Sequence, residues 1–218
     1  MTGLRVVLAS ASPRRHDLLE MIGIAHVVMP ADIDESYRDG ELPRAAAERV
    51  AREKGALIAA TQKDALVISA DTIVVIDDRV LGKPAGGNDA QRMLRQLSGR
   101  THEVLTAVAT TLDGRTESAV EDVRVTFRQL SDELIARYVC TGEPLDKAGS
   151  YGIQGFGATI VERIDGDYFA VMGLALGRLI ELLRRLGVVY EFDGVRRSTQ
   201  KPVAATSQAP GAARSTGA

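Results

Sequence analysis

The sequence predicts an α/β fold built around a mixed β-sheet. Short apolar runs that suit buried strands alternate with stretches whose apolar residues recur every three to four positions, as in amphipathic helices. Several neighbouring strand-like runs are separated only by short turns, which indicates hairpins and therefore some antiparallel pairing. The 218 residues are enough for one large domain or two small lobes.

The first half of the chain is expected to begin with a strand at residues 4–8. Pro13 suits the first position of a helix, with Ser12 as its N-cap. A second helix is expected from Pro43 to about residue 60. Further along, this half contains a long apolar strand at residues 66–76 that polar residues interrupt at 69–72, a hairpin turn at 77–79 and a short strand at 80–81.

In the second half, apolar spacing and turn residues predict two further hairpin strands between helices. The elements expected are a helix at 88–97 capped by Asn88, a strand at 104–111, a turn at Asp113-Gly114, a strand at 123–127 with one wet face, a helix after Ser131 to residue 139, a glycine-rich loop at 142–157, a strand at 158–164 and a last helix at 172–186. Residues 1–194 are expected to form the domain, and residues 195–218, which lack apolar periodicity, a disordered tail.

The bulk composition excludes several classes of protein. The formal net charge is -2, whereas a general nucleic-acid binder carries a strong basic excess. Neither a signal peptide nor a membrane-spanning run is recognisable, so a cytoplasmic protein with no membrane or nucleic-acid partner is expected. Cys140 is the only cysteine, which rules out a disulfide framework; its helical setting predicts a small buried apolar residue.

Serine and arginine side chains crowd the turn that follows the first strand. Ser10 and Ser12 precede Pro13, and Arg14 and Arg15 follow it within the first helical turn. Free backbone amides at a helix start, hydroxyl groups and guanidinium groups together suit an anion, most plausibly phosphate. The alternative is an ordinary capped helix with solvated arginines.

Two charged residues stand in apolar surroundings. Asp71 lies inside the apolar strand at 66–76, where an unpaired carboxylate costs several kcal/mol; such an acid is typical of a general base or a metal ligand. The alternative is a structural Asp that caps a bend. Lys54 falls on the apolar stripe of its helix, between Val50 and Leu57, where it either extends out to solvent or meets an anion in a cleft.

Three further segments carry candidate groups. Lys83 lies between a glycine and a proline, on a stiff loop that would hold its charge in place. Asp34 and Glu35 are adjacent acids, for which two interpretations stay open: they bind a magnesium ion, or they lie on a solvated loop without a ligand. Gln154, in the glycine-rich stretch 149–157, offers both the donor and the acceptor that reading a nucleobase requires, although a flexible connector would look similar.

These pieces occur together and in order, as LASASPRRHDLL, DIDES, AREKG, SADTIVVIDDRVLGKP, QLSGRTHEVLTAVA and EPLDKAGSYGIQGFGATIVERIDGDYFAVMGL. In this the chain resembles the Maf family of nucleoside triphosphate pyrophosphatases, named from septum formation in bacteria. The resemblance implies an elongated mixed sheet with flanking helices, two lobes around a central cleft, as in the inosine triphosphatase group, and a homodimer. It also implies cleavage between the α and β phosphates with a divalent cation, Mg²⁺ or Mn²⁺.

The resemblance implies roles for the charged residues. Ser10, Arg14 and Arg15 would hold the phosphates of a nucleoside triphosphate. Lys54 and Lys83 would neutralise the triphosphate and belong to the catalytic group.

The same resemblance assigns the remaining positions. Asp71 would be the general base that deprotonates water, and Glu35 and Asp71 would bind the metal. Thr72, Gln154 and Arg14 resemble the branch that prefers dTTP and UTP, with Gln154 contacting the base. The chain contains no tryptophan to stack a methylated purine, which favours this branch over the one that acts on 7-methyl-GTP.

Alternatives remain open at this point. The family's housecleaning role would admit modified pyrimidine nucleotides, and another base preference such as 7-methyl-GTP is a second possibility. A third possibility is a non-catalytic, nucleotide-binding regulator of cell division. The presence of the charged candidate residues argues against it, because a protein that only binds nucleotides needs no buried base. A single-stranded nucleic-acid binder lacks its aromatic platform, since aromatics make up only 4% of the chain.

Overall fold

A computed structural model describes residues 3–199 of the chain. Within this range a mixed sheet has the strand order β2-β1-β3-β5-β6-β7, with β4 paired to β3, and β8 and β9 form a separate hairpin. The strands are β1 (Val6–Leu8), β2 (Val27–Val28), β3 (Leu66–Ile76), β4 (Arg79–Leu81), β5 (Thr101–Leu112), β6 (Arg115–Phe127), β7 (Val161–Asp165), β8 (Val188–Tyr190) and β9 (Val195–Arg197). β1 runs parallel to β2 and β3, whereas β3, β5, β6 and β7 pair antiparallel. The predicted α/β fold with a mixed sheet is confirmed.

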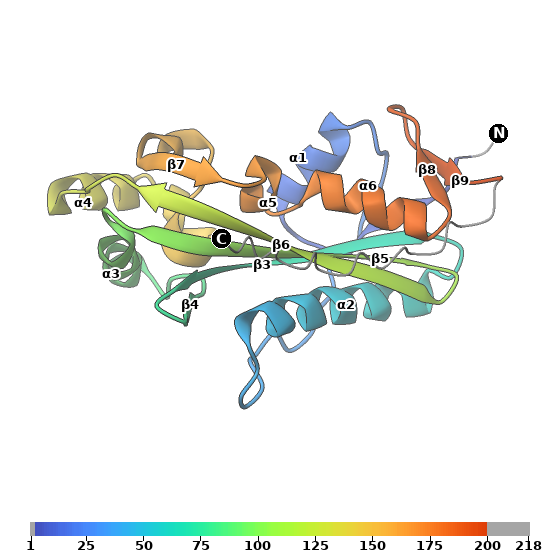
Figure 1. Ribbon diagram of the computed structural model, residues 1–218, viewed down its shortest axis with the longest axis horizontal. Coiled ribbons are helices and arrows are strands. Elements are labelled where there is room, and N and C mark those ends of the chain that lie inside the picture. The colour runs from blue at the N-terminus through green and yellow to red at the C-terminus, as the bar shows by residue number, and fades with distance from the viewer. Residues whose placement is uncertain (1–2, 200–218) are drawn as a thin grey trace, which may run out of the picture.

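Helices cover both faces of this sheet (Figure 1). They are α1 (Pro13–Met21), α2 (Pro43–Thr61), α3 (Gly87–Leu97), α4 (Asp132–Cys140), α5 (Tyr168–Met172) and α6 (Leu176–Arg185), with short 3-10 turns η1 (Glu143–Asp146), η2 (Ala148–Ser150) and η3 (Gly155–Thr159). α2 packs against β3, β5 and β6 on one face, and α5 and α6 pack against β5 and β6 on the other. Apolar side chains fill both interfaces, so the sheet carries a core on each side.

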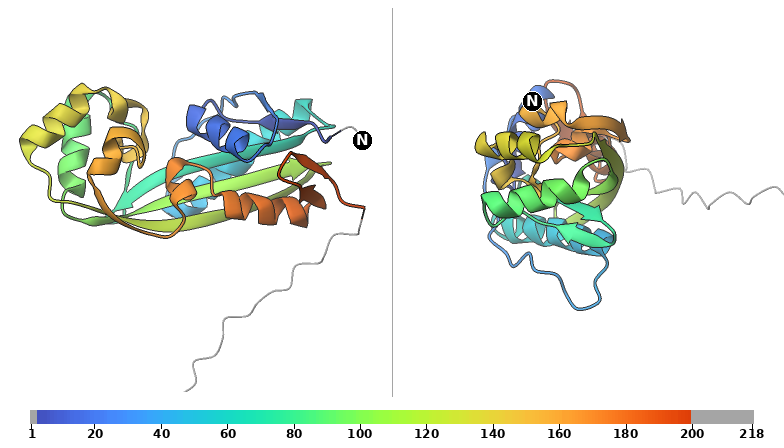
Figure 2. Two further views of the ribbon diagram at one scale, coloured as in Figure 1. Left: turned by 90° about the horizontal axis from the view of Figure 1, so that it is seen from above. Right: turned by 90° about the vertical axis from the view of Figure 1, so that its left-hand side faces the viewer.

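The molecule is elongated along its long strands. Figure 2 shows α3, α4 and the neighbouring 3-10 turns at one end and α1 with β1 and β2 at the other, joined by β3, β5 and β6. β5 and β6 remain paired from Thr101 opposite Thr126 to Leu112 opposite Arg115. This arrangement matches the elongated sheet with two lobes that the family resemblance implies.

Both predicted hairpin turns are confirmed by their backbone angles. Asp113 and Gly114, between β5 and β6, have φ of 51° and 76°. Asp77 and Asp78, between β3 and β4, have φ of 49° and 58°. Two consecutive left-handed residues define the hairpin turn whose twist matches paired strands, and Asp and Gly tolerate that conformation best.

The predicted interruption of the long strand at residues 69–72 is wrong, because β3 runs unbroken from Leu66 to Ile76. The polar groups in this stretch find partners without bending the strand. The Ser69 hydroxyl donates to the Ala51 carbonyl at 2.7 Å, and Thr72 bonds to Thr106 on the neighbouring strand at 3.0 Å. A satisfied polar side chain does not disturb a strand's backbone pairing.

Several predicted boundaries shift. α3 begins at Gly87 after Gly86, and not after Asn88, because the Asp89 carboxylate already accepts the Ala85 amide at 3.0 Å. Residues 155–159 form η3 ahead of a shorter strand β7. The predicted last helix at 172–186 corresponds to α6, which begins at Leu176 because Gly173, at φ of 124°, ends the preceding helix α5; α5 itself was not predicted.

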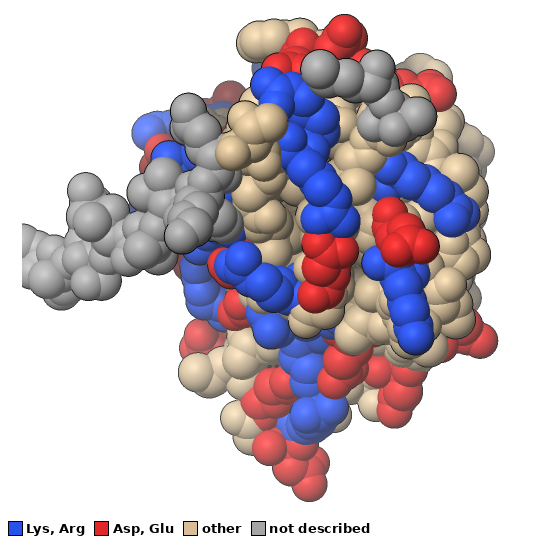
Figure 3. All heavy atoms as spheres, turned by 90° about the vertical axis from the view of Figure 1, so that its right-hand side faces the viewer, with Lys and Arg blue, Asp and Glu red and all other residues tan. Residues whose placement is uncertain are grey.

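Two other predictions about the second half are corrected. Cys140 is exposed at the end of α4 and is not buried. Val195–Arg197 belongs to β9, so the first part of the predicted tail is ordered, and residues 200–218 lie outside the described part of the chain. Arg196 and Arg197 pair with Glu191 and Asp113. Figure 3 accordingly shows positive and negative side chains side by side on this end of the molecule.

Among residues 3–199, no helix has both the length and the apolar composition needed to cross a membrane.

Candidate active site

A cavity of about 640 Å³ lies between the two ends of the molecule and opens beside the middle of β3. Its walls come from the β1–α1 turn, the loop before α2, α2 itself, β3, the loop after β4, the segment 146–154 and the end of α5. Every residue to which the resemblance assigns a role lines it, whereas Asp34, the other candidate magnesium ligand, does not; the lining residues with assigned roles are Ser10, Arg14, Arg15, Glu35, Lys54, Asp71, Thr72, Lys83 and Gln154. The fold therefore gathers residues that are up to 144 positions apart in the sequence, since 154 minus 10 is 144.

Arg15 is one of the buried positive charges of this cavity, with 8% of its surface exposed. Its Nη1 donates to Ser10 Oγ at 2.9 Å, its Nε to the Gly173 carbonyl at 2.8 Å and its Nη2 to Thr72 Oγ1 at 3.2 Å. Burial lowers the pKa of Arg15, while the negative charge of Asp71 acts in the opposite direction. The three acceptors are all neutral, so the guanidinium retains a charge that an anion in the cavity would compensate.

The N-terminus of α1 reaches the same place. Ser12 occupies the predicted N-cap position, but its side chain makes no capping bond; its amide instead donates to Ser10 Oγ at 3.2 Å. The first-turn amides of Arg14 and Arg15 have no acceptor within the helix, as is general at helix starts. Those free donors and the positive end of the helix dipole favour an anion here.

Lys54 lies between two carboxylates. Its Nζ is 2.9 Å from Asp71 Oδ1 and 2.9 Å from Glu35 Oε1, and only 9% of its side chain is exposed. Lys54 therefore does not extend to solvent along its stripe, although Leu57 on the same helix is 45% exposed. A buried ammonium with two acidic partners is electrostatically compensated, and both carboxylates are held at one point.

Close packing of α2 on β3 makes these contacts possible. Gly55 follows Lys54, and a Cβ at that glycine would lie 2.7 Å from Ser69 Oγ. Ser69 in turn donates to the Ala51 carbonyl, which ties the helix to the strand. Because Ser69 and Asp71 lie on the same face of β3, the helix that approaches Ser69 also brings Lys54 to Asp71.

Arg49 anchors the loop that carries Glu35, and sequence reasoning missed this contact. Arg49 donates through Nη2 to the Ser36 carbonyl at 3.0 Å and through Nε to Glu41 Oε1 at 2.7 Å. The hydrogen bond from Arg49 lowers the pKa of Glu41 to about 2. The loop is thereby fastened to α2 one and a half turns before Lys54, which keeps Glu35 next to the lysine.

Thr72 has its hydroxyl proton committed within the protein. Thr106 Oγ1 donates to the Ala170 carbonyl at 2.7 Å, so in its 3.0 Å contact with Thr72 it must accept the Thr72 proton. Thr72 Oγ1 also accepts from Arg15. The hydroxyl thus has no donor left for a nucleobase, and its clearest contact in the structure is the one that orients Arg15.

Replacing Thr72 with valine is expected to raise KM for every nucleoside triphosphate by a similar factor, about 3- to 10-fold, because Arg15 loses one acceptor. The ratio of kcat/KM for UTP over CTP is expected to stay constant, since the lost hydroxyl proton is donated to Thr106 within the protein. Steady-state pyrophosphate release with both nucleotides measures this. A change confined to one base would show instead that Thr72 contacts the nucleobase.

The wall formed by segment 146–154 contributes the remaining polar groups. Gln154 Oε1 is buried and has no hydrogen-bond partner in the described part of the protein. Arg14 reaches across from α1 to pair with Asp146 at 3.3 Å, and Asp146 also pairs with Lys147 at 2.6 Å. Lys83 is exposed and makes no ion pair within residues 3–199. Gln154, with its unpartnered amide oxygen, and Lys83, with no ion-pair partner, therefore line the same cavity.

The Maf-like protein family matches residues 5–186, which is most of the chain and includes every residue of this cavity. The chain belongs to the Maf family. A Maf relative from Syntrophomonas wolfei, named dTTP/UTP pyrophosphatase, is 53% identical over 83% of this chain and 96% of its own length. Another of that name, from Moorella thermoacetica, is 51% identical over 84% and 96%. A solved structure of the Staphylococcus aureus Ham1 protein aligns with 72% of this chain and 79% of its own at a TM-score of 0.44 and 16% identity.

In this Maf protein, four polar side chains of the cavity wall were not singled out from the sequence: Tyr37, Asp146, Lys147 and Tyr151. Asp146 and Lys147 lie within the EPLDKAG stretch, so their charged types in a short loop were an available signal. Tyr37 and Tyr151 gave no such signal in the sequence, because a single tyrosine in a loop does not indicate a functional site. Burial raises the pKa of Tyr37 to about 12, so its hydroxyl stays protonated beside the acids.

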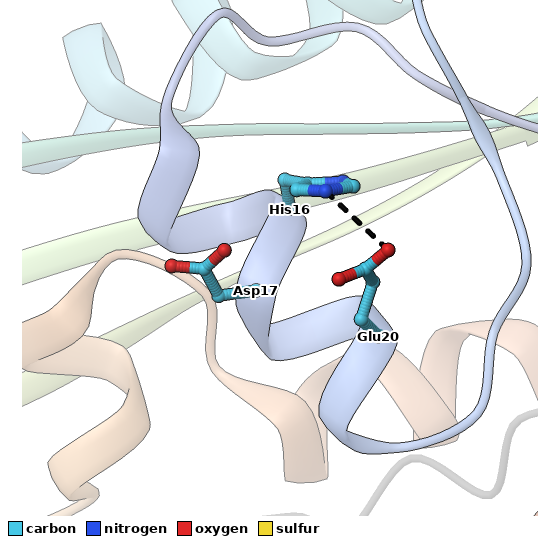
Figure 4. Close-up of side chains that lie close together, drawn as sticks. All are labelled: His16, Asp17 and Glu20. Atoms are coloured by element: carbon cyan, nitrogen blue, oxygen red, sulfur yellow. Dashed lines mark ion pairs between the residues drawn. The ribbon is translucent and has the colours of Figure 1, made fainter.

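A second group of potential ligands lies on the outer face of α1, away from the Maf cavity (Figure 4). His16, Asp17 and Glu20 place ligand atoms within 4.8 Å of one another, a grouping that the spacing of the histidines in the sequence did not suggest. His16 already contacts Glu20 at 3.4 Å and His26 at 2.8 Å. These side chains partner one another, and we assign no ligand to them.

Proposed function

We propose that this protein hydrolyses dTTP and UTP between the α and β phosphates, releasing the nucleoside monophosphate and pyrophosphate. The observation that carries the proposal is the single cavity in which five cationic side chains, Arg14, Arg15, Lys54, Lys83 and Lys147, face three acidic ones, Glu35, Asp71 and Asp146. A net positive cavity suits a triphosphate. The names of the curated relatives support the choice of substrate.

The phosphates bind at the helix start. Arg15, Ser10 and the first-turn amides of α1 supply charge-assisted and neutral donors at one place. Lys83, on the opposite loop, adds an unpaired cation. Together they hold the triphosphate across the cavity and neutralise the negative charge that grows on the leaving pyrophosphate.

Asp71 accepts the proton of the attacking water. It is positioned for this by Lys54, whose ammonium holds its carboxylate at 2.9 Å and keeps it oriented into the cavity. Water then adds at the α-phosphorus. The bond between the α-phosphorus and the α–β bridging oxygen breaks, and its electron pair leaves with the pyrophosphate. Charge neutralisation and positioning account for most of the rate enhancement of such a reaction, and the general base contributes a smaller part.

Glu35 and Asp71 are the residues that would hold a divalent cation. Their carboxylate oxygens converge on one cationic group, the Lys54 ammonium, so the two side chains already share a point of positive charge. One or two carboxylates together with substrate phosphates is the usual oxygen donor set for Mg²⁺. When bound, the ion supplies neutralisation of phosphate charge.

Gln154 reads the base. Its buried, unpartnered Oε1 accepts a hydrogen bond from the N3–H that uracil and thymine present, and its amide N–H suits the neighbouring O4. Cytosine carries an acceptor at N3 and an amino group at C4, so the same amide orientation disfavours it.

The test is pyrophosphate release from a panel of dTTP, UTP, CTP, GTP, 7-methyl-GTP and ITP, with Mg²⁺ or Mn²⁺ and with the cation removed by EDTA. We expect dTTP and UTP to lead and EDTA to abolish turnover, because the triphosphate charge is then uncompensated. Turnover led by another base would keep the reaction and overturn the base assignment. A folded chain that binds nucleotides without turnover would be the regulator instead.

The housecleaning role, the link to septum formation and the homodimer that the resemblance implies stay predictions, and so does the cytoplasmic location expected from the sequence pattern. Sedimentation of the purified protein would measure its oligomeric state.

A further inference from the structure

Gln154 lies outside any α-helix or β-strand that would hold its side chain still. Gln154 lies between η2 and η3, and its Oε1 has no partner among the described residues. An amide can turn over and exchange its donor and acceptor at little cost when nothing restrains it. Discrimination between two bases by this residue therefore requires that the backbone on both sides of it be held in place.

The Glu143 carboxylate holds the backbone after Gln154. Glu143 opens η1 directly behind the loop, and it is partly buried. Its Oε2 accepts the Phe156 amide at 2.9 Å, and its Oε1 accepts the Gly157 amide at 2.9 Å. Burial raises the pKa of Glu143, but the Gly157 and Phe156 amides outweigh it and lower the pKa below its ordinary value. The group therefore stays ionised and binds both amides strongly.

Tyr138 extends the same contact to the backbone before Gln154. Its hydroxyl donates to Glu143 Oε1 at 2.8 Å and accepts the Gly152 amide at 3.1 Å. Burial raises the pKa of Tyr138, so the hydroxyl keeps the proton that it donates. Two side chains thus fasten residues 152 and 156–157, which flank Gln154 on either side.

The loop wraps so closely around the carboxylate that only glycine fits. Gly155 has φ of 69°, and a Cβ there would lie 2.4 Å from Glu143 Oε2. A Cβ at Gly157 would lie 2.1 Å from the Gly152 carbonyl. The glycines of this stretch therefore serve to enclose a side chain of the protein itself, in the way that backbone amides elsewhere enclose a bound anion.

We propose that Glu143 is a positioning residue that sets the base selectivity of the enzyme by holding the Gln154 loop in one conformation. Glu143 does not line the cavity within the described residues, so it acts through the loop and not by contact with the nucleotide. The proposal rests on the proposed function, since it assigns a role to the loop that reads the base.

The experiment compares kcat and KM of the full-length chain for UTP and CTP in wild type and in Glu143→Gln. The glutamine keeps one acceptor but turns a donor toward an amide N–H, which opposes the loop conformation. We expect the UTP-to-CTP ratio of kcat/KM to fall about 10-fold, the loss of one charged hydrogen bond. KM for UTP should rise, and kcat at saturating UTP should stay within about 2-fold, since Asp71 and Lys54 are untouched.

Two variants keep the test decisive. Glu143→Asp retains the carboxylate and should recover part of the selectivity. Tyr138→Phe removes only the hydroxyl and should lower the ratio in the same direction, which tests the proposal even where Glu143→Gln does not fold. The matched control is Glu133→Gln on α4, an exposed residue paired with Arg137, which should change neither constant.

The outcomes separate the two proposals. If the wild type releases no pyrophosphate from dTTP or UTP, the proposed function fails. If the wild type is active and Glu143→Gln keeps the UTP-to-CTP ratio, or loses activity equally toward both nucleotides, then the loop-holding role of Glu143 is wrong and the proposed function stands.

Discussion

Replacing Asp71 with asparagine is expected to slow pyrophosphate release from dTTP by about 10²- to 10⁴-fold, the usual contribution of a positioned general base. Asparagine has nearly the same size but cannot accept the proton of the attacking water. Lys54 keeps Glu35 as an acidic partner, so the substitution leaves no unpaired buried charge and the fold should survive. Single-turnover rates at saturating dTTP measure the chemical step.

The control for this experiment is Asp78→Asn, in the exposed turn directly after β3, where the left-handed backbone suits asparagine. It should retain wild-type turnover. Circular dichroism and dTTP binding show whether the Asp71 variant is folded. Unchanged turnover in a folded Asp71→Asn protein would remove Asp71 from the role of base.

Replacing Arg15 with lysine is expected to raise KM for dTTP at least about 10-fold although the positive charge is retained. The guanidinium donates to three acceptors on the β1–α1 turn, β3 and the end of α5, and a single ammonium cannot satisfy that set while also facing a phosphate. A charged hydrogen bond contributes about 1.5–3 kcal/mol, so the loss of one to substrate accounts for this factor.

The same substitution is expected to lower the free energy of unfolding, because the buried carbonyl of Gly173 and the partly buried hydroxyl of Thr72 lose their donor. Urea unfolding measures the change in the free energy of unfolding, and steady-state kinetics measure the change in KM for dTTP. Arg5→Lys, an exposed arginine at the start of the sheet, is the matched control and should change neither. A normal KM in Arg15→Lys would mean that Arg15 only supports the fold.

Local patterns predicted much of the fold because the periodicity of buried residues and the steric preferences of turns depend on residues that are close in the sequence. The Asp113-Gly114 turn follows from residue types that tolerate left-handed angles, and the strand at 123–127 follows from its apolar alternation, whereas residues 115–122 of β6 were not predicted. The predicted break in β3 was wrong for the opposite reason. Whether Ser69 and Thr72 disturb a strand depends on acceptors from α2 and β5, which lie far away in the sequence.

Local sequence patterns predicted most strands and helices, the two hairpin turns and the chemical types gathered in the cavity, but not α5, β8 or β9. The pairing of the cavity groups is a property of the folded chain: Lys54 contacts both Glu35 and Asp71, Thr72 contacts Arg15, and Glu143 contacts the loop of Gln154. The physical reason is that local conformation depends on adjacent residues, whereas these contacts depend on sheet register and on how closely a helix packs against a strand. Local conformation can therefore be predicted from a single sequence, whereas these long-range contacts are seen only in the folded protein.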